Sequence, residues 1–203
     1  QMGVADGIAL ANKLQKNNEA VLVFTGDGGA SEGDFHEAIN VAAVWQLPVI
    51  IIVENNQWGL STPSSEQFRM KSFADKGIGY GIDAVSIDGN DFMEVYETVK
   101  YWADEIRQNP RPVLIECMTF RMRGHEEASG TAYYPEGLIE AWESKDPILR
   151  FENFLKEKRI LTDGSIQELR KELSDFVLSE LEYADNLPKI IPDKETELKD
   201  VYA

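Results

Sequence analysis

The sequence predicts an α/β fold in which a doubly wound parallel sheet is followed by C-terminal helices. Four short, mainly apolar segments begin about 30 residues apart, at 20–24, 49–53, 83–87 and 113–118. Helical patterns fill two of the stretches between them, at 31–45 and 92–108. Repeated strand–helix units of this size favour parallel strands with helices packed on both faces.

The individual segments support this prediction to different degrees. The first two strands are apolar throughout, as expected when both of their faces are covered, whereas the third and fourth are mixed. Residues 1–14 have the composition of a helix with many small side chains, and residues 55–81 are expected to form a long polar loop. Two amphipathic helices are expected at 149–158 and 165–182, the second opening with the capping-box spacing of Ser165 to Glu168.

The same patterns predict the domain organisation. We expect an α/β domain at 1–147, a helical extension at 148–185, and a Pro- and charge-rich linker or arm toward a partner at 186–203. Because the chain opens inside a helical pattern, we expect it to be a piece of a longer protein whose N-terminal part precedes Gln1.

Composition excludes several classes of function. The 203 residues are 43% hydrophobic and 28% charged, which is typical of a globular domain. With 20 basic and 36 acidic residues the net charge is −16, which argues against nonspecific nucleic-acid binding. No apolar run approaches the ~20 residues that a membrane span needs. One cysteine and two histidines argue against a disulfide framework and against a Cys- or His-rich metal site.

Two unusual loops follow the first two strands. Gly26-Asp27-Gly28-Gly29 follows the first strand, and Asn55-Asn56 follows the second. Neighbouring parallel strands would bring these loops together at the edge where open sheets bind ligands. Glycines let backbone N–H groups approach a phosphate. A carboxylate beside a phosphate is repulsive unless a divalent cation lies between them, and carboxylate, amide and carbonyl oxygens suit Mg²⁺.

Two other interpretations of these loops remain open from the residues alone. Both loops could be ordinary turns at strand ends. They could also belong to a Rossmann-type nucleotide site, with Glu54 as the ribose-binding acid at the end of the second strand. Against the second interpretation, Ser31 stands where the third glycine of that motif belongs, and Asp27 would face the pyrophosphate without a metal.

The combination of motifs resembles a known family. Gly26-Asp27-Gly28 followed by Asn55-Asn56 is similar to the thiamine diphosphate motif, with Asp27 and Asn56 29 residues apart. Segments 30–36 and 61–67 resemble the α subunit of 2-oxo acid dehydrogenases, and the second is closer to the branched-chain type than to the pyruvate type. The resemblance implies the fold of a thiamine diphosphate-binding domain.

The resemblance also implies a ligand set at the two loops. Asp27 and Asn56 would bind Mg²⁺ through side-chain oxygens. Trp58, where the family usually has Tyr, would bind Mg²⁺ through its backbone carbonyl. Gly28 and Gly29 would contact the diphosphate through backbone amides.

A later loop carries two more implied site residues. Arg121 and His125 match the Arg- and His-bearing loop of the family near the cofactor. His125 would contact the diphosphate or handle protons around the reacting group, and a histidine is suited to either role near neutral pH. The alternative is a solvated loop histidine. The acidic pair Glu126-Glu127 stands where mammalian relatives carry a phosphorylated serine, so we do not expect that regulation here.

The implied function is the oxidative decarboxylation of a 2-oxo acid, with branched-chain acids favoured over pyruvate, and transfer of the acyl group to a lipoyl-bearing acyltransferase. A β subunit or β-like domain would supply the glutamate that activates the cofactor, within an α2β2 tetramer or a fused homodimer. The expected compartment is the cytoplasm in a bacterium or the mitochondrial matrix in a eukaryote. The alternatives are an acetoin-cleaving or transketolase-like enzyme, a Rossmann-type NAD-dependent dehydrogenase and a non-catalytic subunit.

Overall fold

The computed structural model describes residues 1–126 and 128–200 and divides into two compact units. The first unit spans Gln1–Phe151 and holds the sheet, and the second begins at Glu152. The boundary between them lies within helix α7 (Pro147–Glu157).

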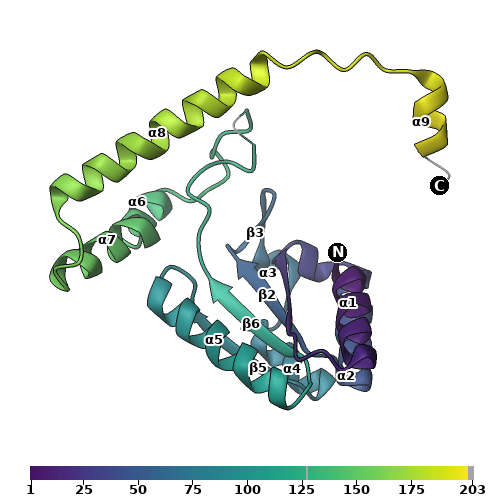
Figure 1. Ribbon diagram of the computed structural model, residues 1–203. Helices are drawn as coiled ribbons and strands as arrows, with labels where there is room; N and C mark the ends of the chain where they lie inside the picture. Colours follow the sequence, from purple (N-terminus) through teal and green to yellow (C-terminus); the bar gives the residue numbers. More distant parts are fainter. Residues whose placement is uncertain (127, 201–203) are drawn as a thin grey trace. The chain divides into compact units, whose positions relative to one another are not determined.

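A four-stranded parallel sheet forms the centre of the first unit (Figure 1). Its strands are β1 (Val21–Gly26), β2 (Val49–Asn55), β5 (Asp83–Asp88) and β6 (Val113–Met118), in the order β1-β2-β6-β5. Every neighbouring pair is parallel. The structure thus confirms the predicted α/β class and all four predicted strands, with boundaries that shift by two residues at most.

Both faces of the sheet are covered, as the apolar character of β2 predicts. Val49, Ile51 and Val53 point into one core, and Ile50 and Ile52 point into the other. This alternation follows from the two-residue period of a strand, and burial on both faces explains why polar residues are missing until the strand's end.

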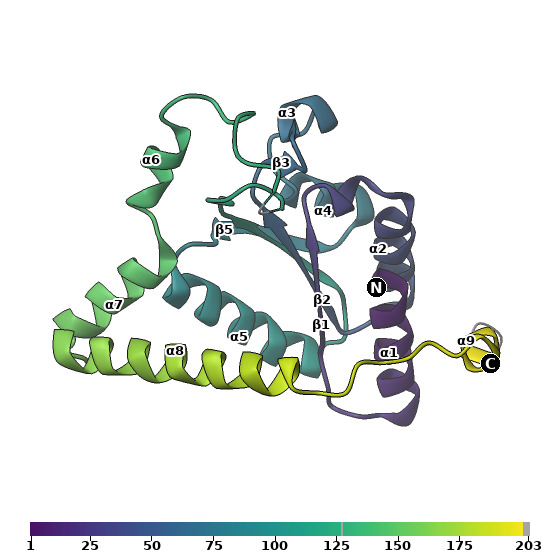
Figure 2. The same cartoon turned by 90° about the horizontal axis from the view of Figure 1, so that it is seen from above.

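The covering helices come from the predicted strand–helix alternation. Helices α1 (Met2–Gln15), α2 (Gly33–Trp45) and α4 (Ala74–Tyr80) pack on one face, and α5 (Phe92–Gln108) packs on the other. Figure 2 shows α1 and α2 on the side of the sheet opposite to α5. Asp91 caps α5 by accepting hydrogen bonds from two backbone N–H groups of its first turn.

The structure differs from the sequence-based prediction in two segments near the strand ends. Helix α2 begins at Gly33 rather than at residue 31, because the short 3₁₀ turn η1 (Gly29–Ser31) precedes it. The expected loop at 55–81 contains the hairpin of β3 (Trp58–Gly59) and β4 (Thr62–Pro63), a single helical turn α3 (Ser64–Gln67), and α4. Elements of two to seven residues are too short to show a hydrophobic period.

The chain beyond the sheet is helical, and one of its caps differs from the prediction. Helix α6 (Leu138–Glu143) was not expected; α7 and α8 (Asp163–Asp185) match the two predicted amphipathic helices, and α9 (Lys194–Asp200) lies within the segment expected to be an arm. The capping box of α8 joins Thr162 to Ser165, three residues before the expected box. Over the described range, no helix combines the length and apolarity needed to cross a membrane.

Strand β1 is an edge strand with apolar side chains in the open. Leu22 and Phe24 are 43% and 50% exposed, and with Phe92 and Tyr96 of α5 they line a groove of about 460 Å³. Apolar side chains gathered on one face in this way mark a surface that another protein surface can cover.

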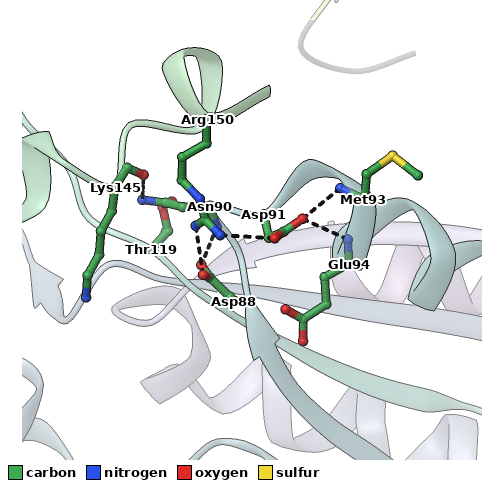
Figure 3. A network of polar contacts seen from close by, with 8 residues as sticks. All are labelled: Asp88, Asn90, Asp91, Met93, Glu94, Thr119, Lys145 and Arg150. Atoms are coloured by element: carbon green, nitrogen blue, oxygen red, sulfur yellow. Dashed lines mark hydrogen bonds and ion pairs between the residues drawn. The ribbon is translucent and has the colours of Figure 1, made fainter. Parts of the chain in front are cut away.

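A polar network fixes the chain that leaves the sheet (Figure 3). Arg150 donates to Asp88 Oδ2 at 2.8 Å and to Asp91 Oδ2 at 3.0 Å. Asn90 is 5% exposed; its side chain donates to the Lys145 carbonyl and accepts from Thr119 Oγ1. Within the first unit, the turn between β5 and α5 therefore holds the segment from 145 to 150.

We expect Arg150→Met to lower the free energy of unfolding by roughly 1 kcal/mol at pH 7, because the ion pairs involve side chains that are 33–42% exposed and partly screened by water. Burial raises the pKa of Asp88, but the hydrogen bonds from Arg150 and the Asn90 backbone, with the charges of Arg150 and Lys145, outweigh it and hold this pKa below its ordinary value. The contribution of Asp88 is therefore complete above the unfolded-state pKa of about 3.9 and is lost as the pH falls through the lower folded-state pKa.

Urea unfolding of both proteins across this pH range measures the difference. The difference in the free energy of unfolding between wild type and Arg150→Met should disappear below pH ~4. Arg107→Met, which removes a solvent-exposed ion pair with Asp104, is the matched control and should change stability far less than Arg150→Met does. A gap that persists unchanged to pH ~2 would contradict the assignment to these carboxylates.

Candidate cofactor site

The loops that follow β1 and β2 meet at the carboxyl edge of the sheet, as predicted. The register of the two strands places Gly26 opposite Glu54, so both loops leave the sheet at the same level. A Cβ on Gly28 would lie 3.2 Å from the Gly59 Cα, and a Cβ on Gly29 would lie 2.5 Å from Thr25 Oγ1. Gly28 therefore allows a close approach between the backbones of the two loops, and Gly29 leaves room for the Thr25 side chain.

Asp27 is the central charged group of this edge. Its side chain is buried, with 1% of the residue exposed, and Ser64 Oγ donates to its Oδ2 at 3.0 Å. Burial raises the pKa of Asp27, although hydrogen bonds from Ser64 and from the Asp27 and Gly28 backbone, together with the Arg121 charge, act to lower it. The charged carboxylate is thus only partly compensated by this chain, and a cation would stabilise it.

The two asparagines after β2 shape their loop by local hydrogen bonds. Asn55 Oδ1 accepts from the Gln57 N–H at 3.0 Å, and Asn56 Oδ1 accepts from the Trp58 N–H at 3.0 Å. These are two successive Asx turns, in which a side-chain oxygen bonds the backbone two residues on. Gln57 takes the left-handed conformation with φ of +68°. Asn56 Oδ1 keeps a second lone pair that can accept a further bond.

Trp58 ties this loop to the segment around residue 133. It opens the β3–β4 hairpin opposite Pro63. Its ring lies 5.6 Å from the ring of Tyr133 and 5.0 Å from that of Tyr134. These aromatic contacts fix the side chain, so the position of the Trp58 backbone carbonyl is set by packing as well as by the hairpin.

The structure brings Arg121 and His125 to the same loop. Arg121 donates from NH2 to the Leu60 carbonyl at 2.6 Å and to the Tyr133 hydroxyl at 2.9 Å. Its NH1 lies 3.1 Å from Nδ1 of His125. Because a guanidinium can only donate, Nδ1 is the acceptor, and a neutral His125 carries its proton on Nε2. The His125 side chain is exposed.

The segment after His125 turns back on itself. Ser129 Oγ donates to the Glu126 carbonyl at 2.9 Å and accepts from the Glu126 N–H at 3.2 Å. Glu127, the second residue of the acidic pair in this loop, lies outside the described residues.

The loops at this edge carry oxygen donors of the types that a hard divalent cation accepts. The set contains the Asp27 carboxylate, the Asn56 side-chain oxygen and the Trp58 carbonyl, which are the ligand types that Mg²⁺ accepts alongside phosphate oxygens. Within residues 1–126 and 128–200, His, Cys, Asp and Glu side chains form no cluster of three or more that could hold a metal.

Sequence reasoning missed several residues of this edge. Ser64 holds Asp27, and Tyr133 and Tyr134 hold Trp58, but serines and tyrosines in polar loops give no signal of their own. Glu116 is different, since a single charged residue inside the apolar strand 113–118 is a visible anomaly. It is fully buried and accepts a hydrogen bond from Asn55.

We expect Asp27→Asn to stabilise the ligand-free protein at pH 7 by about 0.5–2 kcal/mol, the scale seen when a site residue is replaced by a better-fitting one. An amide accepts from Ser64 as the carboxylate does but avoids the cost of burying a charge. Thermal unfolding in the presence of a chelator measures the effect. Asp34→Asn, at an exposed position of α2, is the control and should leave stability within about 0.5 kcal/mol. A destabilised Asp27→Asn protein would mean that the charge is already compensated within the protein.

Comparison with known proteins identifies the family of this chain. The sequence profile described as "Dehydrogenase E1 component" matches residues 1–193. The chain is 36% identical over 204 residues to the 2-oxoisovalerate dehydrogenase subunit alpha of Bacillus subtilis (strain 168). The matched region covers 100% of this chain and 61% of the relative.

Two further relatives cover all of this chain. It is 37% identical over 205 residues to the mitochondrial 2-oxoisovalerate dehydrogenase subunit alpha 2 of Arabidopsis thaliana, covering 43% of that protein. It is 30% identical over 202 residues to the pyruvate dehydrogenase E1 component subunit alpha of Rickettsia bellii (strain RML369-C), covering 61% of it. The chain thus spans between two fifths and about three fifths of the length of these relatives. Since the family profile covers nearly all of its residues, the chain belongs to the family of dehydrogenase E1 components.

Proposed function

We propose that this chain is the diphosphate- and Mg²⁺-binding half of a thiamine diphosphate-dependent 2-oxo acid dehydrogenase. The observation that carries the proposal is the buried, partly compensated carboxylate of Asp27. It lies at the carboxyl edge of the sheet, where β2 also ends and the loop with Asn56 and Trp58 begins. Membership of the dehydrogenase E1 component family supports it. The acidic chain, with a net charge of −16, would bind an anionic cofactor because a metal supplies the positive charge locally.

Different groups at this edge would bind the metal and the diphosphate. Asp27 and Asn56 would hold Mg²⁺ through side-chain oxygens and Trp58 through its carbonyl, while the Gly28 and Gly29 backbone amides would bind the diphosphate. When bound, thiamine diphosphate supplies a carbon nucleophile and an electron sink for decarboxylation.

Arg121 and His125 would serve the reacting end of the site. Arg121 fixes the tautomer of His125, so that the Nε2–H is the group available to donate. An exposed imidazole in this state can donate a hydrogen bond to a diphosphate oxygen or pass a proton to the reacting group. The hydrogen bond from Arg121 to the Leu60 carbonyl would keep the guanidinium in place for both roles.

The proposed activity needs partners. A β subunit or β-like domain would supply the glutamate that activates the cofactor, in an α2β2 tetramer or a fused homodimer, and a lipoyl-bearing acyltransferase would accept the acyl group. The exposed apolar groove beside β1 and the names of the relatives as alpha subunits support an assembly. We propose 1–147 as the binding domain, 148–185 as its helical extension and 186–203 as the linker or arm. The compartment would be a bacterial cytoplasm or the mitochondrial matrix.

The first test is calorimetric titration of thiamine diphosphate into the complete assembly, with and without Mg²⁺. We expect binding that requires Mg²⁺ and that Asp27→Ala weakens by at least about tenfold, because a metal ligand is lost. Asp34→Ala removes the same charge from an exposed position and should bind normally. Absence of binding in both conditions would reject the thiamine proposal, and titration with NAD would then test the Rossmann alternative. Binding of neither molecule would leave a non-catalytic subunit.

The substrate proposal has its own test. With the acyltransferase component present, we expect a higher kcat/KM for 2-oxoisovalerate than for pyruvate, since segment 61–67 resembles the branched-chain type. A pocket that accommodates the two extra methyl groups gains about 1–3 kcal/mol, a preference of about 10- to 200-fold. A higher kcat/KM for pyruvate would contradict the proposed preference for branched-chain 2-oxo acids. Turnover of acetoin or of a ketose phosphate with neither 2-oxo acid used would point instead to the acetoin-cleaving or transketolase-like alternative.

A further inference from the structure

Glu116 is a buried carboxylate that the proposed ligand set does not use. It lies in the middle of β6 with 0% of its surface exposed, between apolar neighbours. Asn55 Nδ2 donates to its Oε1 at 2.7 Å, and Ser72 Oγ donates to its Oε2. A buried carboxylate is costly even when it is hydrogen-bonded, so its presence in a strand calls for a specific use.

Asn55 connects Glu116 to the loop after β2 by hydrogen bonds. Because its amide N–H group is turned toward Glu116, its Oδ1 is turned toward the Gln57 N–H, 3.0 Å away. Gln57 has φ of +68°, a left-handed conformation that costs a residue other than glycine roughly 1 kcal/mol and persists only when its surroundings hold it. The hydrogen bond that the Gln57 N–H donates to Asn55 Oδ1 is one of the contacts that hold this conformation.

The same chain of hydrogen bonds continues to Asp27. The Gln57 carbonyl accepts from the Ser64 N–H at 2.8 Å, and the Ser64 hydroxyl donates to Asp27 Oδ2 at 3.0 Å. Four hydrogen bonds therefore join Glu116 to Asp27 by way of Asn55, Gln57 and Ser64. These residues, apart from Asp27, line one cavity of about 230 Å³ at the carboxyl edge of the sheet.

We propose that Glu116 is a positioning residue: through Asn55 it sets the conformation of residues 55–59, and with it the directions of the Asn56 side-chain oxygen and the Trp58 carbonyl. The identity of the ligand rests on the proposed function, but the constraint on the loop does not. Glu116 itself touches neither metal nor cofactor. It acts as the outer-shell partners of metal ligands do, and loss of such partners typically weakens metal binding about 10- to 100-fold.

A carboxylate suits this position because both of its oxygens can only accept. Asn55 can satisfy Glu116 in one orientation alone, with its NH₂ group toward the carboxylate and its oxygen toward Gln57. Glutamine at 116 could keep the bond from Asn55 with its own oxygen and donate to Ser72 Oγ. Leucine, which has a similar volume, removes both acceptors and leaves the buried Asn55 NH₂ group with only the Met118 thioether sulfur, a weak acceptor 3.4 Å away, as a partner.

The test compares Glu116→Leu and Glu116→Gln in the complete protein with any partner subunit it assembles with. Amide hydrogen exchange of the ligand-free form reports on the Gln57 and Trp58 N–H groups. We expect Glu116→Leu to speed their exchange about tenfold or more. Titration with Mg²⁺ at fixed thiamine diphosphate should then show a half-saturation point raised by about tenfold or more, with full binding recovered at saturating Mg²⁺. Glu116→Gln should stay within about threefold of wild type in both measurements, because it keeps the bond from Asn55.

Asn90→Ala provides the structural control. Asn90 is 5% exposed and bonded at the same edge of the sheet, to Thr119 and to the Lys145 carbonyl, but outside the chain of bonds from Glu116 to Asp27. It should lower the unfolding temperature without moving the Mg²⁺ midpoint or the exchange of the Gln57 N–H. Should Glu116→Leu not fold, Asn55→Ala breaks the next link, at the last residue of β2, and should give the same two changes.

Each outcome decides the inference. It is overturned if Glu116→Leu, or Asn55→Ala in its place, leaves exchange at Gln57 and Trp58 unchanged, or if Asn90→Ala raises that exchange and the Mg²⁺ midpoint equally. If the wild-type assembly does not bind thiamine diphosphate with Mg²⁺, the proposed function fails. The exchange rates then decide alone whether Glu116 positions the loop.

Discussion

The parallel pairing of β1 with β2 is the constraint on which the rest of the site depends. Because Gly26 lies opposite Glu54, the glycine-rich turn and the asparagine loop leave the sheet at the same edge. Parallel strands carry the chain in one direction, so both loops are C-terminal to their strands without any special arrangement. The close approach at Gly28 and Gly59 then packs one loop against the other.

This packing produces a buried charge that the protein only partly compensates. Asp27 keeps a hydrogen bond from Ser64 and feels the charge of Arg121, but burial still raises its pKa. A site that is poised to bind a cation is therefore also a site of local instability in the ligand-free protein. Another buried carboxylate, Glu116, accepts hydrogen bonds from two donors, and in our proposal it positions the loop rather than binding a ligand.

Contacts between distant segments give the site its geometry. Arg121 reaches the Leu60 carbonyl, and Tyr133 and Tyr134 pack on Trp58, so the loop after β6 and the segment near 133 both bear on the β3–β4 hairpin. At the neighbouring turn, Arg150 and Asn90 hold the departing chain. Hydrogen bonds thus organise the carboxyl edge of the sheet after β2, β6 and β5, which are neighbours in the sheet.

The sequence by itself determined the four strands, their parallel arrangement and the two loops, because apolar runs, glycines and a paired asparagine are local signals. It could not determine the start of α2 or the short elements between 55 and 81, which are too brief for a period. Only the tertiary structure decided which groups hold Asp27 and Asn55. Ser64 lies 37 residues from Asp27, and Glu116 lies 61 from Asn55. Hydrogen bonds over such separations depend on how the strands are ordered in space, and no local pattern records that order.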